Sequence, residues 1–412
     1  MSLIDVSGYL LFTAFIAYLI ATILFGGAIK PSKLEYAPAR AEKWGKLAIT
    51  VTIIGFIANV AYFITRWIYT GHAPVSNMFE FTTAFGMFIV ASFIVIYFMY
   101  RVAALGMVAL PIAVLIIGYA AMFPKEVTPL VPSLQSHWLT IHVICAAIGE
   151  SILAISAVAG LIYLLKNVDL TKRSQERFWL EAVMYSCVLV IGFVASSITF
   201  GTMGYESTYK YVDKEDNPQT IVYNTPALFG MNEYEEITFV DKEKKLYEPV
   251  LEEDKSFEPL VETPALINAK KLSTLTWSII FGTVIYLLIR LIGRRSISAM
   301  LQPLVKRVNS QLMDEIGYRS VLIGFPVFTL GALIFAMIWA QIAWSRFWGW
   351  DPKEVWALIT WLFYAAFLHL RLSKGWEGKK SAWLAVIGFT IIMFNLVFVN
   401  LIIAGLHSYA AS

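Results

Sequence analysis

The sequence predicts an all-α polytopic membrane protein with about ten transmembrane helices. Hydrophobic residues make up 58% of the 412 residues, charged residues only 15%, and the mean hydropathy is +0.67. Several apolar runs reach about twenty residues, and each is long enough to cross about 30 Å of hydrocarbon. This composition excludes an ordinary soluble protein, in which charged residues are more frequent.

In chain order the apolar runs predict spanning helices over residues 8–29, 46–69, 78–100, 102–123, 139–166, 178–200, 273–293, 318–344, 354–372 and 382–404. The first run has no basic segment before it and no small-residue cleavage site after it. We therefore interpret it as a retained helix and not as a signal peptide. Cys145 and Cys187 form no Cys-x-x-Cys pair, which argues against a thiol oxidoreductase.

The distribution of basic residues predicts the orientation. If the N-terminus lies outside, the inner connections carry 20 Lys and Arg residues and the short outer connections carry four. The positive-inside rule then places both the N- and C-termini outside. Residues 201–271 become one acidic extracytoplasmic loop with 15 acidic and eight basic residues. Residues 237–250 are compatible with a hairpin and the rest with irregular structure, and the loop fits either a docking surface or a solvated linker.

Tryptophan is concentrated in one short stretch. Six of the 13 tryptophans lie between residues 339 and 361. Asp351-Pro-Lys-Glu354 has the pattern of a helix start, with an N-cap Asp, a Pro at the first position and a Glu at the third. Trp344, Trp348 and Trp350 therefore lie in a short connection between two helices. Such indole faces beside a carboxylate suit a flat, aromatic, partly charged ligand. The alternatives are an interfacial aromatic belt and a purely capping Asp351.

The run WSRFWGWDPKEVWALITWLFYAAFLHLR (344–371) resembles the tryptophan-rich WWD signature of the CcsA/ResC family of system II cytochrome c biogenesis. GHAPVSNMFEF (71–81), LQSHWLTIHV (134–143) and GFPVFTLGALIFAMIWA (324–340) support the same resemblance. It implies a haem-handling membrane protein. Residues 167–312, which contain a helix pair and the loop 201–271, would be an insertion between an N-terminal bundle (1–166) and the WWD-containing bundle (313–412).

Two histidines are predicted at the outer ends of helices, on the side of the tryptophan-rich connection. His142 begins the fifth predicted helix and His407 follows the tenth. Two imidazoles at one depth can ligate a haem iron from opposite faces. The resemblance implies the same pair, whereas an interfacial histidine taken alone is more often a polar tip in the headgroup region than a ligand. His137 is five residues before His142 and would not share its helical face.

His369 lies about 22 Å along its helix from Glu354, deep in the membrane. An ionisable residue at this depth is a functional candidate, although a hydrogen bond to a neighbouring helix, or snorkelling together with Arg371, is the alternative. The resemblance implies an inner haem site at His369, with the second iron ligand from a CcsB/ResB-type partner subunit. For His72, which precedes the third helix, we favour turn formation.

The resemblance implies that the chain moves haem b, as substrate and bound ligand, across the bacterial cytoplasmic membrane. With its partner it would act as a holocytochrome c synthase (haem lyase) on the outer face, joining haem to the CxxCH thiols of apocytochrome c. A thioredoxin-like protein would keep these thiols reduced. Catalysis would be mostly positioning, without an assigned acid or base. Alternatives are a haem exporter without ligation activity and an ion- or solute-coupled transporter. For the transporter, Glu80, Glu150 and His369 are the only candidate buried charges, which is too few.

Overall fold

The computed structural model describes residues 2–29, 37–127, 135–212, 218–231, 234–238, 259–263, 269–373 and 375–399. Two compact units are present. Unit 1 holds the described residues up to Leu180 and from Ile297 to Val399, and unit 2 those from Glu181 to Ser296. The predicted division at 166/167 and 312/313 stays a prediction.

The α- and π-helices are α1 (Leu3–Ile29), α2 (Ala37–Thr70), α3 (Met78–Tyr100), α4 (Ala103–Ala120), α5 (His137–Asn167), α6 (Gln175–Thr202), α7 (Ala269–Gly293), α8 (Ile297–Val305), α9 (Ser310–Phe328), η2 (Thr329–Phe335), α10 (Ala336–Trp344), α11 (Pro352–Arg371), α12 (Lys379–Phe394) and η3 (Asn395–Val399).

The chain is a multi-pass membrane protein. Nine helical segments in its described part are long and apolar enough to cross a membrane, which confirms the prediction of a polytopic helical protein with about ten spans. Segments α9, η2 and α10 together make one of these spans. Helix α11 is not among the nine, because Lys353, Glu354, His369 and Arg371 lower its mean hydropathy. It packs nevertheless against α9, η2, α12 and η3 in the bundle of unit 1.

Helix α5 is the centre of unit 1, where it packs against α3, α4, α8, α9, η2, α10 and α12. Small residues along it let neighbouring backbones approach closely, as is common between membrane helices. A Cβ atom on Gly149 would lie 2.5 Å from the backbone nitrogen of Phe328. A Cβ atom on Gly160 would lie 2.8 Å from the carbonyl oxygen of Ala382. These backbone contacts fix the positions from which α5 presents its side chains.

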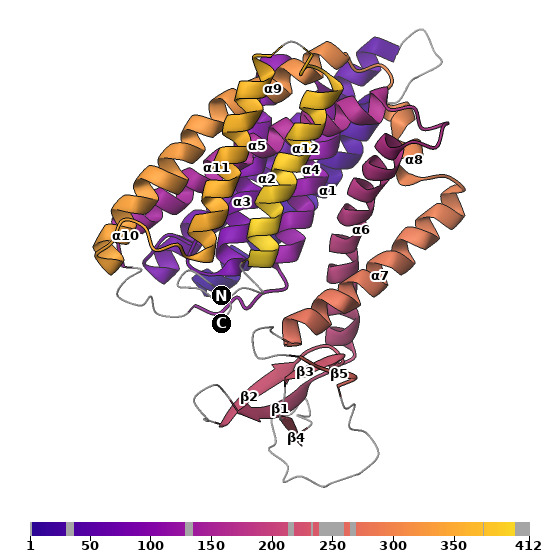
Figure 1. Cartoon of the computed structure of the whole chain (residues 1–412). Coiled ribbons are helices and arrows are strands. Elements are labelled where there is room, and N and C mark those ends of the chain that lie inside the picture. Colours follow the sequence, from indigo (N-terminus) through magenta and orange to yellow (C-terminus); the bar gives the residue numbers. More distant parts are fainter. Residues whose placement is uncertain are drawn as a thin grey trace. The chain divides into compact units, whose positions relative to one another are not determined.

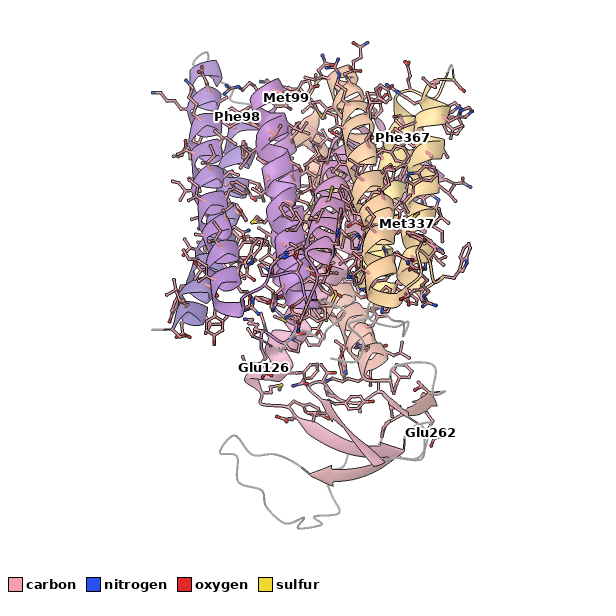
Figure 2. The ribbon with its side chains drawn as sticks, turned by 90° about the vertical axis from the view of Figure 1, so that its left-hand side faces the viewer. Phe98, Met99, Glu126, Glu262, Met337 and Phe367 are labelled. Atoms are coloured by element: carbon pink, nitrogen blue, oxygen red, sulfur yellow. The ribbon has the colours of Figure 1, made fainter. Side chains whose placement is uncertain are left out.

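The helices of unit 1 run up and down between two ends (Figure 1). We name one end, where α1, α3, α5 and α11 begin and α10 terminates, the tryptophan end. The opposite end, where α2, α9 and α12 begin, is the basic end. Figure 2 shows Phe98 and Met99 of α3 at the basic end and Glu126, which follows α4, at the tryptophan end. At the basic end the Arg371 guanidinium donates hydrogen bonds of 3.2 and 2.6 Å to the Asp314 carboxylate.

The helix predicted over residues 318–344 begins earlier, at Ser310, and contains the π-helical segment η2. Pro326 lies in α9 just before it and lacks the N–H that an α-helix would use. In a π-helical turn the hydrogen bond spans five residues, so the helix widens locally. Such turns often occur at functional sites. Here η2 packs against α5.

Unit 2 contains strands that the sequence analysis missed. They are β1 (Ser207–Val212), β2 (Pro218–Tyr223), β3 (Phe229–Met231), β4 (Tyr234–Thr238) and β5 (Val261–Thr263). β1 pairs antiparallel with β2 and β4, and β3 pairs parallel with β5. The prediction of irregular structure was therefore wrong here. β1 and β2 are rich in Thr, Tyr, Val and Ile, which favour strands. Residues 239–250, most of the predicted hairpin, lie outside the described residues.

Candidate functional site

His142 lies in the second turn of α5, and its Nδ1 atom is 2.9 Å from the carbonyl oxygen of Gly331 in η2. A carbonyl oxygen can only accept a hydrogen bond, so Nδ1 must carry the proton. In the neutral ring, Nε2 is then the nitrogen with the lone pair. This is the tautomer in which an imidazole ligates a metal ion through Nε2, held in orientation by the bond at its other nitrogen.

The carbonyl of Gly331 reaches His142 because η2 and α5 touch at this point. In η2 this carbonyl also accepts the i+5 hydrogen bond from the backbone N–H of Ala336. A Cβ atom on residue 331 would overlap the backbone nitrogen of Ala146. Only a glycine therefore permits this approach.

Trp339 connects His142 to the tryptophan-rich stretch. The imidazole of His142 stacks on the indole of Trp339, with ring centroids 5.8 Å apart and an interplanar angle of 13°. Trp339 in turn packs edge-on against Trp344, with centroids 4.7 Å apart. Trp339 is 2% exposed, so its ring is fixed by the surrounding bundle. The structure thus joins two predicted site residues, His142 and Trp344, through a third aromatic residue that was not among the predicted site residues.

Trp348 and Trp350 form an edge-to-face pair in the connection between α10 and α11, with centroids 6.1 Å apart. The backbone of Trp350 is left-handed (φ 57°), and its side chain is 71% exposed. Both features are unfavourable for a large aromatic residue, and such strain is concentrated at functional sites. The Nε1 atom of Trp348 is buried and has no hydrogen-bond partner in the described part of the chain. This connection therefore offers an exposed indole face and an unsatisfied N–H donor.

The connection is held by a capping box at the start of α11. The Asp351 side chain accepts a hydrogen bond from the backbone of Lys353, and the Glu354 carboxylate accepts from the backbones of Gly349 (2.7 Å) and Asp351 (3.1 Å). Asp351 is 7% exposed. The predicted N-cap role of Asp351 is therefore confirmed. Its predicted contact with the edge of a ligand stays a prediction.

Replacing Glu354 by alanine should loosen this connection, because two backbone N–H groups lose their acceptor. We expect a loss of about 1–2 kcal/mol at the helix start. The measurement is the rate of tryptic cleavage after the exposed Arg346, which should rise in the variant. Glu126→Ala, which removes an exposed carboxylate at the same end of the bundle, is the control. Equal cleavage rates for both variants would show that the capping box does not hold the connection.

His369 lies near the end of α11, close to the basic end, and is exposed on the surface of the described chain. Its neighbour Phe367 is 1% exposed and faces the bundle. So near the end of a membrane helix, such exposure means contact with the headgroup region, with lipid or with another chain. A ring nitrogen in lipid would lack a hydrogen-bond partner, which is costly. His369 is therefore accessible from outside the bundle of unit 1.

The remaining predicted ligand, His407, lies outside the described residues, so its pairing with His142 stays a prediction. His137, at the first residue of α5, is exposed. His72 lies in the connection between α2 and α3 and hydrogen-bonds through Nδ1 to the carbonyl oxygen of Ala73 (3.1 Å). Glu80, considered above as a transport residue, forms an ion pair with Arg66.

These residues fit haem in three respects. Haem is a planar macrocycle with a central iron and two carboxylates at its edge. His142 presents the nitrogen type that iron takes as an axial ligand. Trp344 and Trp350 supply aromatic surfaces, and the buried Nε1–H of Trp348 is a donor suited to a carboxylate.

A family model described as "Cytochrome C assembly protein" matches residues 75–407. Similar curated proteins carry the name "Cytochrome c biogenesis protein CcsA". The protein from Synechocystis sp. (strain ATCC 27184 / PCC 6803 / Kazusa) is 29% identical over 419 residues, which cover 99% of each chain. The protein from Marchantia polymorpha is 30% identical over 385 residues, which cover 89% of this chain and 91% of the relative. The protein from Pyropia yezoensis is 27% identical over 394 residues, which cover 93% and 94%.

Proposed function

The chain belongs to the cytochrome c assembly protein family, and from that premise we propose that it delivers haem to the outer face of the membrane and attaches it covalently to the CxxCH thiols of apocytochrome c. A role in cytochrome c maturation follows from the family. The delivery and attachment steps are our proposal. So are the location in the bacterial cytoplasmic membrane and a site on its extracytoplasmic side.

The observation that carries this proposal is the environment of His142. Its Nδ1–H is held by the Gly331 carbonyl, and its ring lies against Trp339, which leads to Trp344. A histidine that only anchors a helix in the headgroup region does not need a fixed tautomer and an aromatic platform. We propose His142 and His407 as axial ligands of the outer haem, with Trp344, Trp348, Trp350 and Asp351 around the macrocycle.

We propose that haem enters at His369. The exposure of this residue on a membrane-embedded helix supports a shared site, in which a CcsB/ResB-type subunit supplies the second axial ligand. The bundle around Phe367 and the Arg371–Asp314 pair hold α11 in place at this end. Haem would then move from this inner site to the outer site at His142.

Attachment requires a thiol to add across a vinyl group of haem. The sulfur bonds to one vinyl carbon, the carbon–carbon π bond breaks, and the thiol proton ends on the other vinyl carbon, so no external oxidant or reductant is consumed. The contribution of the protein is to hold haem and thiols together, which alone can lower the barrier by several kcal/mol. A thioredoxin-like protein would keep the cysteines in the thiol form.

Replacing Gly331 by alanine should weaken haem binding at the outer site roughly tenfold, because outer-shell partners of a ligating histidine typically contribute 10–100-fold to affinity. The added methyl group would overlap Ala146 and push the carbonyl of residue 331 away from His142. The measurement is haem affinity by absorbance titration, together with the reduction potential of bound haem. Gly27→Ala, where a Cβ atom meets Trp44 at an ordinary 3.4 Å, is the control. An unchanged haem affinity and an unchanged reduction potential would show that Gly331 does not contribute to the haem site.

The proposed function is tested in a host that lacks its own cytochrome c maturation system. The full chain is expressed there with its partner subunit and an apocytochrome c, and covalent haem is detected on denaturing gels and by the pyridine haemochrome spectrum. We expect covalent haem on the cytochrome. Bound haem in the purified complex without covalent product would support the exporter without ligation activity and contradict the proposal.

A further inference from the structure

A cavity of about 660 Å³ opens at the tryptophan end of unit 1, and the proposed haem site does not account for it. Its wall comes from the end of α2, the connection between α2 and α3, Val127 and the start of α5. Two of the five histidines in the chain, His72 and His137, line it. Its volume lies within the range of about 300–1,000 Å³ that is typical of small-molecule sites.

A buried ion pair holds the connection between α2 and α3, which forms part of the cavity wall. Arg66 and Glu80 are 2% and 1% exposed, and the Nε atom of Arg66 lies 2.7 Å from Oε1 of Glu80. The other carboxylate oxygen accepts hydrogen bonds from the backbone N–H (3.0 Å) and hydroxyl (2.7 Å) of Ser76. The Nη2 atom of Arg66 donates to the carbonyl of Lys125, next to this wall. The wall is thus set in one shape before any ligand enters.

The lining of the cavity is more apolar than polar, and its described residues carry no fixed charge. Among the described lining residues there is no carboxylate, Lys or Arg, whereas Gln135, Ser136 and Thr140 supply amide and hydroxyl groups. The Nδ1 atom of His72 donates to the Ala73 carbonyl, so Nε2 holds the lone pair. This Nε2 atom is buried and has no partner in the described residues. The cavity therefore suits a neutral ligand that brings a hydrogen-bond donor, and a carboxylate fits it poorly.

The cavity lies beside the proposed haem site. Leu139 is in its wall, and His142 follows three residues later on the same face of α5, about 4.5 Å along the helix axis. The backbone of His142 therefore lies one helical turn beyond a residue of the cavity wall. A group that reacts with the haem edge could bind at this position.

We propose that this cavity takes the Cys-x-x-Cys-His segment of the apocytochrome, with Nε2 of His72 accepting a hydrogen bond from a cysteine thiol. This inference rests on the proposed function, which supplies a thiol-bearing peptide as substrate. A thiol is a neutral donor, and backbone amides of a peptide match the hydroxyl and amide groups of the wall. His72 is then a substrate-binding residue, and the Arg66–Glu80 pair positions it.

The test is the affinity of the full chain, purified with its partner subunit, for a fluorescent peptide that contains Cys-x-x-Cys-His under reducing conditions. His72→Asn keeps a donor near Nδ1 but removes the acceptor at Nε2, and it should weaken binding roughly tenfold. His72→Gln places an amide oxygen near the Nε2 position and should retain most of the affinity. Thr140→Trp, which fills the cavity, should abolish binding. A peptide with alanines in place of both cysteines has no side-chain donor for Nε2, and it should bind the unmodified protein as weakly as the cysteine peptide binds His72→Asn.

Haem absorption of each variant is recorded in parallel and should not change. Unchanged peptide affinity in His72→Asn and Thr140→Trp, or no peptide binding by the unmodified protein, would overturn the inference. Loss of haem absorption with unchanged peptide binding would assign the cavity to haem instead. Failure of the proposed function has a different signature, namely peptide binding that depends on His72 but no covalent haem in the heterologous host.

Discussion

Replacing His142 by alanine is expected to remove outer-site haem from the purified protein and to stop cytochrome c maturation. The reason is that His142 presents Nε2 as the ligating nitrogen, with Nδ1 held by Gly331 and the ring stacked on Trp339. Loss of an axial ligand should lower haem affinity more than the tenfold expected for its outer-shell partner. The measurement is the absorbance spectrum of the purified protein with its partner subunit, before and after addition of free imidazole.

Imidazole should restore a six-coordinate spectrum to His142→Ala, because the cavity left by the side chain accepts the free ligand. His137→Ala is the matched control, since it removes an exposed imidazole from the same helix five residues earlier. It should retain its haem. Equal haem content in both variants, with unchanged spectra, would refute His142 as a ligand.

Replacing Arg66 by methionine is expected to cost about 3–5 kcal/mol of stability, because it leaves the Glu80 carboxylate buried without its counter-ion. Both side chains are almost fully buried, and the arginine also lies over the ring of Phe79 at 5.1 Å. The double variant Arg66→Met with Glu80→Gln should recover much of this loss, since no unpaired charge remains. The measurement is thermal unfolding of the purified protein in detergent.

Arg319→Met provides the comparison for this effect. Arg319 pairs with Glu315 on one helix, but the two side chains are 54% and 42% exposed. Exposed pairs of this kind contribute about 0–1 kcal/mol, so its unfolding temperature should change little. If Arg66→Met were no less stable than Arg319→Met, the buried pair would not hold the connection between α2 and α3.

Sequence reasoning could place His142 at a helix end because depth in the membrane follows from position along an apolar run. It could also predict the capping box of α11, since Asp351, Pro352 and Glu354 are neighbours in the chain and act locally. It missed Trp339 as a partner of His142 and the carbonyl of Gly331 altogether. Every residue has a backbone carbonyl, so the residue type at position 331 does not reveal this hydrogen bond. The carbonyl of Gly331 reaches α5 only because η2 is π-helical and packs against α5.

Glu80 also shows what the sequence alone does not give, namely the partner of a buried side chain. The sequence presents it as a buried charge and thus as a candidate for transport. The structure pairs it with Arg66 from the preceding helix and with Ser76, so its role is to shape a connection. The polarity of a residue can be read from the chain, but its partner depends on how two helices are rotated against each other.

The sequence by itself determined the class of this protein, its approximate number of spans and the stretch in which its tryptophans are concentrated. Hydrocarbon thickness acts on each apolar run separately, so these properties are local. Only the tertiary structure decided that His142 meets Gly331, 189 residues away, and that His72 and His137 line one cavity. Such contacts depend on which helix faces pack together. The small residues of α5 permit this packing, but they do not specify which residue of a neighbouring helix lies against them.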